Sequence, residues 1–278
     1  MSAWLDDLRG RLPRHAELID ALVAICAADD RIEVLELQCS IARGAGDELS
    51  DLDLGLAVRD QDWEAVAAEL PDRLRSISGT VDLLDHTMPE WGTRAHRRIF
   101  VQYADGRQVD LVVQPASNLA GRVPGAVVLY DPAGRLATER RPASIAATAD
   151  DLRAWEMLGW ELLANVAKYL ARGSAWEALE RLNDARGMAL RLWAAAEGVP
   201  YPLFGLTSLL DAEPQRLPDG LESTVSGLEP DALRRAAVAC GQLLRHAAAN
   251  AKSRLGIDGT ETPMADHVLA LLRPDRAR

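Results

Sequence analysis

The chain has 278 residues, of which 48% are hydrophobic and 26% charged, and its formal net charge at pH 7 is −11. These proportions are typical of globular proteins, and the length allows two domains that each bury a core. No apolar run approaches the length of a membrane span, and Asp6 and Asp7 stand where a signal peptide needs basic residues. We therefore expect a cytoplasmic protein that has no membrane partner.

The negative charge is concentrated in the first half of the chain. Residues 1–145 contain 24 acidic residues and 16 arginines, a balance of −8, and the remaining residues have a balance of −3. Such a field repels nucleic acid phosphates and favours cationic small molecules, so we expect no nucleic acid partner. Three cysteines far apart in the sequence predict neither a disulfide framework nor a zinc site.

The first half alternates helical periodicity with short β-rich runs. We predict helices over residues 12–28 and 62–78, and strands over residues 34–38, 51–58, 99–103, 108–113 and 126–130. Asp105-Gly106 separates two of the β-rich runs, and this pair is a strong signal for a β-hairpin.

The second half contains only helical patterns. They cover residues 151–170, 175–197, 230–249 and 264–272. Strand-rich sequence followed by helix-only sequence predicts an α+β fold. We expect an α+β domain over residues 1–145, with a mixed β-sheet and flanking helices, and an all-α helical bundle domain over residues 146–278.

Two aspartates in the run 51–58 are the main candidate metal ligands. Side chains alternate across a strand, so Asp51 and Asp53 share one face and the leucines between and after them point to the other. Magnesium prefers carboxylate and phosphate oxygens, and a close carboxylate pair can hold an ion against a triphosphate. The sequence therefore predicts a Mg²⁺ site at Asp51 and Asp53.

The turn that precedes this strand offers phosphate-binding groups. The predicted strand 34–38 runs into Cys39-Ser40, where a hydroxyl group and exposed backbone amides can meet phosphate oxygens. Arg43 in the same turn is a second candidate for phosphate binding. Gly44 and Gly46 let the chain turn back towards Asp51.

Ser40, the ten-residue spacer 41–50 and Asp51-Leu52-Asp53 together resemble the signature of the nucleotidyltransferase superfamily to which DNA polymerase beta belongs. That signature is Gly-Ser, a spacer of similar length and Asp-x-Asp. Cys39 stands where the family has glycine. The resemblance implies a nucleotidyltransferase domain that uses Mg²⁺ and a nucleoside triphosphate, with Ser40 on the phosphates.

Asp110 is the candidate for a third acidic residue. It lies between Val109 and Leu111 in the second strand of the predicted hairpin, where a lone carboxylate is costly unless it is paired or coordinated. In the family that the chain resembles, this position either completes the metal site or takes a proton from the acceptor hydroxyl. The sequence leaves both roles open, together with that of a hydrogen-bonded structural aspartate.

The helical half is similar to that of the aminoglycoside and lincosamide adenylyltransferases, in which a Tyr-Leu-x-Arg-Gly helix junction matches residues 169–173. The resemblance implies that Lys168 contacts the triphosphate, whereas its place near a helix end also suits a solvated charge. Glu90, Glu156 and Glu161 are candidate acids for an acceptor amine, or surface carboxylates.

These features predict a magnesium-dependent adenylyltransferase that moves AMP from ATP to a hydroxyl of a small acceptor, and the resemblance suggests an aminoglycoside or lincosamide antibiotic and a role in antibiotic resistance. Asp51, Asp53 and Asp110 are the predicted catalytic and metal residues, and Ser40, Arg43 and Lys168 the predicted nucleotide contacts. The alternatives are a nucleotidyltransferase that modifies a partner protein and a nucleotide-binding module without catalysis.

Overall fold

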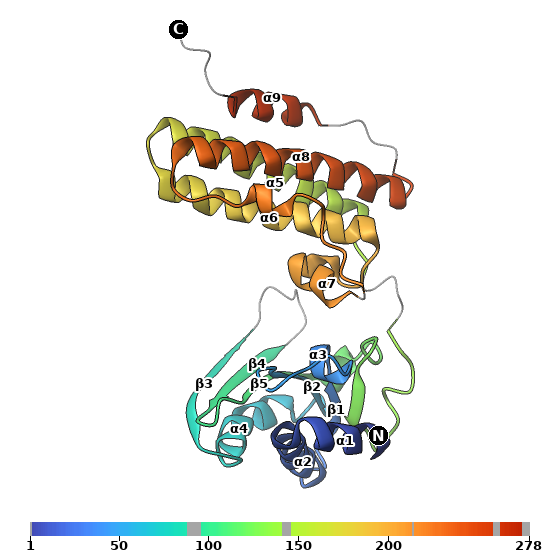
Figure 1. Cartoon of the computed structure of the whole chain (residues 1–278). Coiled ribbons are helices and arrows are strands. Elements are labelled where there is room, and N and C mark those ends of the chain that lie inside the picture. The colour runs from blue at the N-terminus through green and yellow to red at the C-terminus, as the bar shows by residue number, and fades with distance from the viewer. Residues whose placement is uncertain (1, 88–95, 141–145, 213, 258–261, 274–278) are drawn as a thin grey trace. The chain divides into compact units, whose positions relative to one another are not determined.

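The computed structural model describes residues 2–87, 96–140, 146–212, 214–257 and 262–273, and it divides the chain into two compact units (Figure 1). The first unit is Met1–Arg141 and the second is Pro142–Arg278. The domain boundary predicted from the sequence lies between residues 145 and 146.

The first unit is built on a six-stranded sheet with the order β3-β4-β5-β2-β1-β6. The strands are β1 (Ile32–Leu37), β2 (Leu52–Val58), β3 (Thr80–Thr87), β4 (Arg97–Tyr103), β5 (Gln108–Pro115) and β6 (Val127–Tyr130). The central pair β2 and β5 is parallel, and the other neighbouring pairs are antiparallel. The predicted mixed sheet is therefore confirmed.

Helices cover the apolar face of this sheet. Figure 1 shows α1 (Ser2–Arg11), α2 (Pro13–Ala27) and α4 (Trp63–Arg75) on one side of it. One hydrophobic core joins residues of these helices to the alternate, inward-facing residues of the strands, among them Leu52, Leu54, Leu56, Leu111 and Val113. The polar residues of the same strands are thereby left to the opposite face.

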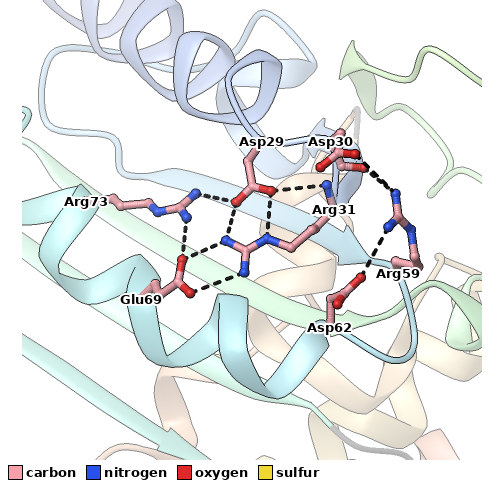
Figure 2. A network of polar contacts seen from close by, with 7 residues as sticks. All are labelled: Asp29, Asp30, Arg31, Arg59, Asp62, Glu69 and Arg73. Atoms are coloured by element: carbon pink, nitrogen blue, oxygen red, sulfur yellow. Dashed lines mark hydrogen bonds and ion pairs between the residues drawn. The ribbon is translucent and has the colours of Figure 1, made fainter.

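A network of ion pairs ties the turn between α2 and β1 to α4 (Figure 2). We call Asp29, Arg31, Glu69 and Arg73 the Asp29 network. Arg31 donates to both oxygens of Asp29 at 2.8 Å, and Arg73 Nη1 donates to Asp29 Oδ2 at 2.7 Å. Both arginines also reach Glu69, at 2.7 and 2.5 Å. The hydrogen bonds from Arg31 hold the pKa of Asp29 well below its usual range.

The second unit is helical in its described residues, as predicted. Its helices are α5 (Ala149–Ala171), α6 (Ala175–Glu197), α7 (Leu206–Asp211), α8 (Pro230–Arg254) and α9 (Pro263–Leu271). Alanine and leucine side chains of α5, α6 and α8 form a core around the buried Trp160. Helix α5 starts with a capping box, in which Thr148 and Asp151 each accept a backbone N–H of the other residue. The small side chains allow close helix packing.

Several elements were not predicted. Helices α1 and α7, the short helix α3 (Cys39–Ala42) and strand β3 lie outside the helix and strand ranges assigned from the sequence. Strand β3 is the edge of the sheet, and it exposes residues of both its faces, so its sequence lacks the alternation that indicates a half-buried strand. Strand β3 forms through its antiparallel pairing with β4, and its own sequence does not indicate a strand.

Candidate functional site

Strand β2 places two carboxylates on the face of the sheet opposite the main core. Asp51 directly precedes the strand, and Asp53 is its second residue. Both side chains are half-buried, whereas the leucines that alternate with them are buried. The carbonyl oxygen of Asp53 accepts a 2.8 Å hydrogen bond from the backbone N–H of Gln38, which fixes this end of β2 to the end of β1.

The parallel pairing of β2 and β5 brings the third carboxylate beside the first two. Asp53 and Asp110 are register partners across the two central strands, so both side chains leave the same face of the sheet. We call Asp51, Asp53 and Asp110 the carboxylate cluster. The expected placement of a third acidic residue on a strand next to β2 agrees with this register.

The carboxylate cluster carries more negative charge than its surroundings balance. Burial raises the pKa of Asp53 to about 6, and the charges of Asp51 and Asp110 add to this rise. A hydrogen bond with Cys39 and the charge of Arg43 act in the opposite direction. A site with this excess of negative charge favours a cation.

The predicted phosphate turn is the short helix α3 (Cys39–Ala42), which follows β1. Ser40 lies in it, and its carbonyl oxygen accepts the backbone N–H of Ala45 at 3.0 Å. Cys39 has a φ of 57°, in the left-handed region where a side chain is unfavourable and glycine is preferred. The departure from glycine at this position therefore places backbone strain beside Asp53.

Two glycines shape the loop from α3 to Asp51, as expected from the sequence. Gly44 has a φ of 79°. A Cβ atom on Gly46 would lie 2.4 Å from Cγ1 of Ile41 and 3.0 Å from its Cα, so only glycine allows this approach. The loop is also held by the buried His15, whose Nε2 donates to the carbonyl oxygen of Ser50 at 2.9 Å.

A buried glutamate supports the same face of the sheet and was not found from the sequence. Glu36 of β1 is the register partner of Gly55, and its Oε1 accepts the side-chain amide of Gln38 at 3.0 Å. Burial raises the pKa of Glu36. A Cβ atom on Gly55 would lie within 3.1 Å of Gln38 and 3.3 Å of Glu36, which explains the glycine there.

Arg98 of β4 is the main residue that the sequence reasoning missed. Its guanidinium group donates to both oxygens of Asp110, with Nε at 2.7 Å from Oδ1 and 3.0 Å from Oδ2. The hairpin turn at Asp105-Gly106 sets Phe100 opposite Asp110, which puts Arg98 two residues along on the same face. The number of residues between Arg98 and that turn is the sequence signal that indicates its position beside Asp110.

The donor atoms fit a divalent cation in part. Asp51 and Asp53 offer adjacent carboxylates with a deficit of positive charge, which suits Mg²⁺. Asp110 is instead engaged by Arg98, and within the described ranges no three His, Cys, Asp or Glu side chains are arranged to hold a metal ion. The pair Asp51 and Asp53 is therefore the part of the cluster that suits a metal.

The remaining candidates lie in the second unit or outside the described residues. Lys168 is in α5, where its Nζ donates to Asn165 at 2.5 Å and lies 4.6 Å from the centre of the Tyr169 ring. Glu156 is buried and paired with Lys252 at 2.7 Å, so it serves the packing of α5 on α8. Glu161 is an exposed residue of α5. Glu90 lies outside the described residues.

The comparisons with known proteins give distant structural similarity and no sequence match. No protein-family model matches the chain, and no curated protein sequence matches it. The crystal structure of an aminoglycoside 6-adenyltransferase from Bacillus subtilis is similar over 92% of this chain and 95% of that chain, at 16% sequence identity and a TM-score of 0.40. This similarity is too low to assign a substrate or an activity. No helix in the described part of the chain is long and apolar enough to span a membrane.

Proposed function

We propose that this protein is a magnesium-dependent nucleotidyltransferase that moves AMP from ATP to a hydroxyl group of a small acceptor. The observation that carries the proposal is the carboxylate cluster, in which Asp53 faces Asp110 across parallel strands while Asp51 stands beside it. The raised pKa of Asp53 supports a need for added positive charge at this place. The resemblance of residues 40–53 to the superfamily signature supports the same reaction.

In this proposal Asp51 and Asp53 hold Mg²⁺, which supplies positive charge to the phosphates when it is bound. Ser40 and Arg43 position the β- and γ-phosphates. The acceptor oxygen forms a bond to the α-phosphorus, and the bond from that phosphorus to the leaving pyrophosphate breaks. Asp110 either completes the ion site or takes the hydroxyl proton.

We infer a cationic acceptor from the charge of the first unit. Residues 1–145 carry a balance of −8, which attracts a polyamine-like molecule and repels nucleic acid. Aminoglycosides and lincosamides carry amino groups and hydroxyl groups, so they are the first acceptors to test, and resistance to such antibiotics would be the biological role. A cationic metabolite meets the same requirement.

The test is pyrophosphate release from ATP and Mg²⁺ with a panel of aminoglycosides and lincosamides. Asp51→Asn is expected to lower the rate about a thousandfold, because losing a metal ligand removes several kcal/mol of charge stabilisation. Asp30→Asn is the matched control, since Asp30 is 93% exposed and the substitution changes the net charge equally. Full activity in Asp51→Asn would contradict the metal assignment.

A second candidate function is a nucleotide-binding module without catalysis. The strained Cys39 in the phosphate turn and the engagement of Asp110 by Arg98 favour it. Such a module binds ATP with Mg²⁺ but releases no pyrophosphate with any acceptor of the panel or with a cell extract. Release with an extract alone would instead favour a protein or an unidentified metabolite as the acceptor.

A further inference from the structure

The ion pair between Arg98 and Asp110 places the positively charged guanidinium group of Arg98 inside the carboxylate cluster. Both oxygens of Asp110 accept hydrogen bonds from the guanidinium group, through Nε and through Nη2. The side chain of Arg98 is 35% exposed and that of Asp110 is 18% exposed. A paired guanidinium and carboxylate form a planar, directional contact, so this cation has a defined place on the sheet.

The charge of Arg98 acts on the whole cluster. The hydrogen bonds to Asp110 raise the pKa of Arg98, and the charges of Asp53 and Asp51 raise it further. The ring of Phe100, the next residue on the same face of β4, has its centre 6.0 Å from the guanidinium carbon. Arg98 is therefore paired with Asp110 beside an aromatic ring, and its charge acts as a counter-ion to all three carboxylates.

The contact also limits what a second cation can do. A metal ion that used Asp110 together with Asp53 would have to displace at least one of the bonds from Arg98, and it would meet the repulsion of the guanidinium charge. The guanidinium group of Arg98 hydrogen-bonds to Asp110, whereas it acts on Asp51 and Asp53 through its charge. The cluster is thus divided into a carboxylate pair open to a metal and a third carboxylate that is already neutralised.

We propose that Arg98 is a positioning residue that withholds Asp110 from divalent cations, so that the protein without nucleotide binds metal through Asp51 and Asp53 alone. This inference rests on the proposed metal role of those two aspartates. Loss of Arg98 converts Asp110 into an added ligand and makes the cluster a tighter metal site.

The experiment measures Mn²⁺ binding by electron paramagnetic resonance, with neither nucleotide nor acceptor present. Arg98→Met is expected to tighten Mn²⁺ binding at least about tenfold, because a nearby positive charge is removed and a carboxylate is released. Arg97→Met is the matched control. Arg97 pairs through two nitrogens with Asp85, its side chain leaves the opposite face of β4, and the exposures of 30% and 18% are close to those of the Arg98 pair.

A double variant separates this role from a general structural one. Asp110→Asn added to Arg98→Met should return Mn²⁺ affinity to the wild-type value, since the released carboxylate is gone. The inference is overturned if Arg98→Met leaves Mn²⁺ binding unchanged or weaker, or if the gain survives in the double variant. An equal gain in Mn²⁺ affinity in Arg97→Met would also overturn the inference, because the loss of any arginine on this strand would then tighten Mn²⁺ binding.

The same titration distinguishes this inference from the proposed function. Asp53→Asn in the otherwise unchanged chain should abolish Mn²⁺ binding. Retained binding in that variant would refute the proposed metal pair, whereas lost binding together with no response to Arg98→Met would refute only the role of Arg98. Arg98→Lys, which keeps the charge but not the paired contact, should tighten binding less than Arg98→Met and guards against a folding defect.

Discussion

The first unit contains two groups of acidic and basic side chains that differ in their balance of charge. In the Asp29 network two carboxylates meet two guanidinium groups, and hydrogen bonds from Arg31 keep the pKa of Asp29 low. In the carboxylate cluster the positive charges that act on the three carboxylates are those of Arg98 and Arg43, and the pKa of Asp53 rises to about 6. Balanced charges strengthen the fold, whereas unbalanced charges weaken it and leave a demand for a cation.

Removing the central acid of the Asp29 network should give the largest change in stability. Asp29→Ala removes the more buried of the two acids that Arg31 and Arg73 share, so we expect the free energy of unfolding to fall by about 3 kcal/mol. Urea denaturation at pH 7 measures this change. Asp30→Ala, at an exposed position in the same turn, should lie within about 0.5 kcal/mol of wild type. Similar losses in both variants would mean that the turn, and not the network, is responsible.

Replacing an acid of the carboxylate cluster should raise the stability of the protein, whereas replacing Asp29 lowers it. The folded-state pKa of Asp53, about 6, lies above the unfolded value of about 4, so stability is lost as pH rises from 4 to 6 and the full cost remains above pH 6. Asp53→Asn removes that cost. We expect a gain of about 2 kcal/mol at pH 8 and almost none at pH 4, a value reduced by the partial exposure of the side chain.

This second change is measured by urea denaturation in EDTA, so that no metal offsets the repulsion. Asp29→Asn is the control at both pH values, because its carboxylate has the opposite pKa shift and should lower stability at pH 8. A wild-type chain and an Asp53→Asn variant with equal stability at pH 8 would show that neither burial nor the neighbouring carboxylates disfavour the charged form of Asp53.

The strained turn beside the cluster should give the smallest effect. Cys39→Gly relieves a left-handed backbone conformation, but it also gives the unfolded chain more freedom and loses the thiol contact with Asp53. We expect the free energy of unfolding, measured by thermal denaturation, to rise by about 0.5 kcal/mol. Cys39→Ala keeps the strain and loses the thiol, so it should lower stability by a similar amount. Equal results for the two variants would rule out strain as the cause.

The core of the site was accessible from the sequence because it depends on local patterns. The alternation of residues 51–58 predicted which face holds Asp51 and Asp53, and the Asp105-Gly106 turn predicted the hairpin that carries Asp110. The assignment of Mg²⁺, ATP and the roles of Ser40, Arg43 and Lys168 stays a prediction.

What the sequence did not provide depends on contacts between distant segments. Arg98 became part of the site through its register against β5, and Arg97, an identical neighbour, points to the other face. Strand β3 depends on its pairing with β4, since Thr80–Thr87 exposes residues of both faces. The positive φ of Cys39 follows from the path of the chain between β1 and α3, which composition does not reveal.

The place of Cys39 also gives the protein a natural attachment point for a chemical reporter. The other two cysteines, Cys26 and Cys240, are buried, and burial raises the pKa of each thiol to about 12. Cys39 is exposed and contacts Asp53. A thiol-reactive fluorophore will therefore label this chain at one position without any engineering, and its emission will report directly on what enters the space beside the carboxylate cluster.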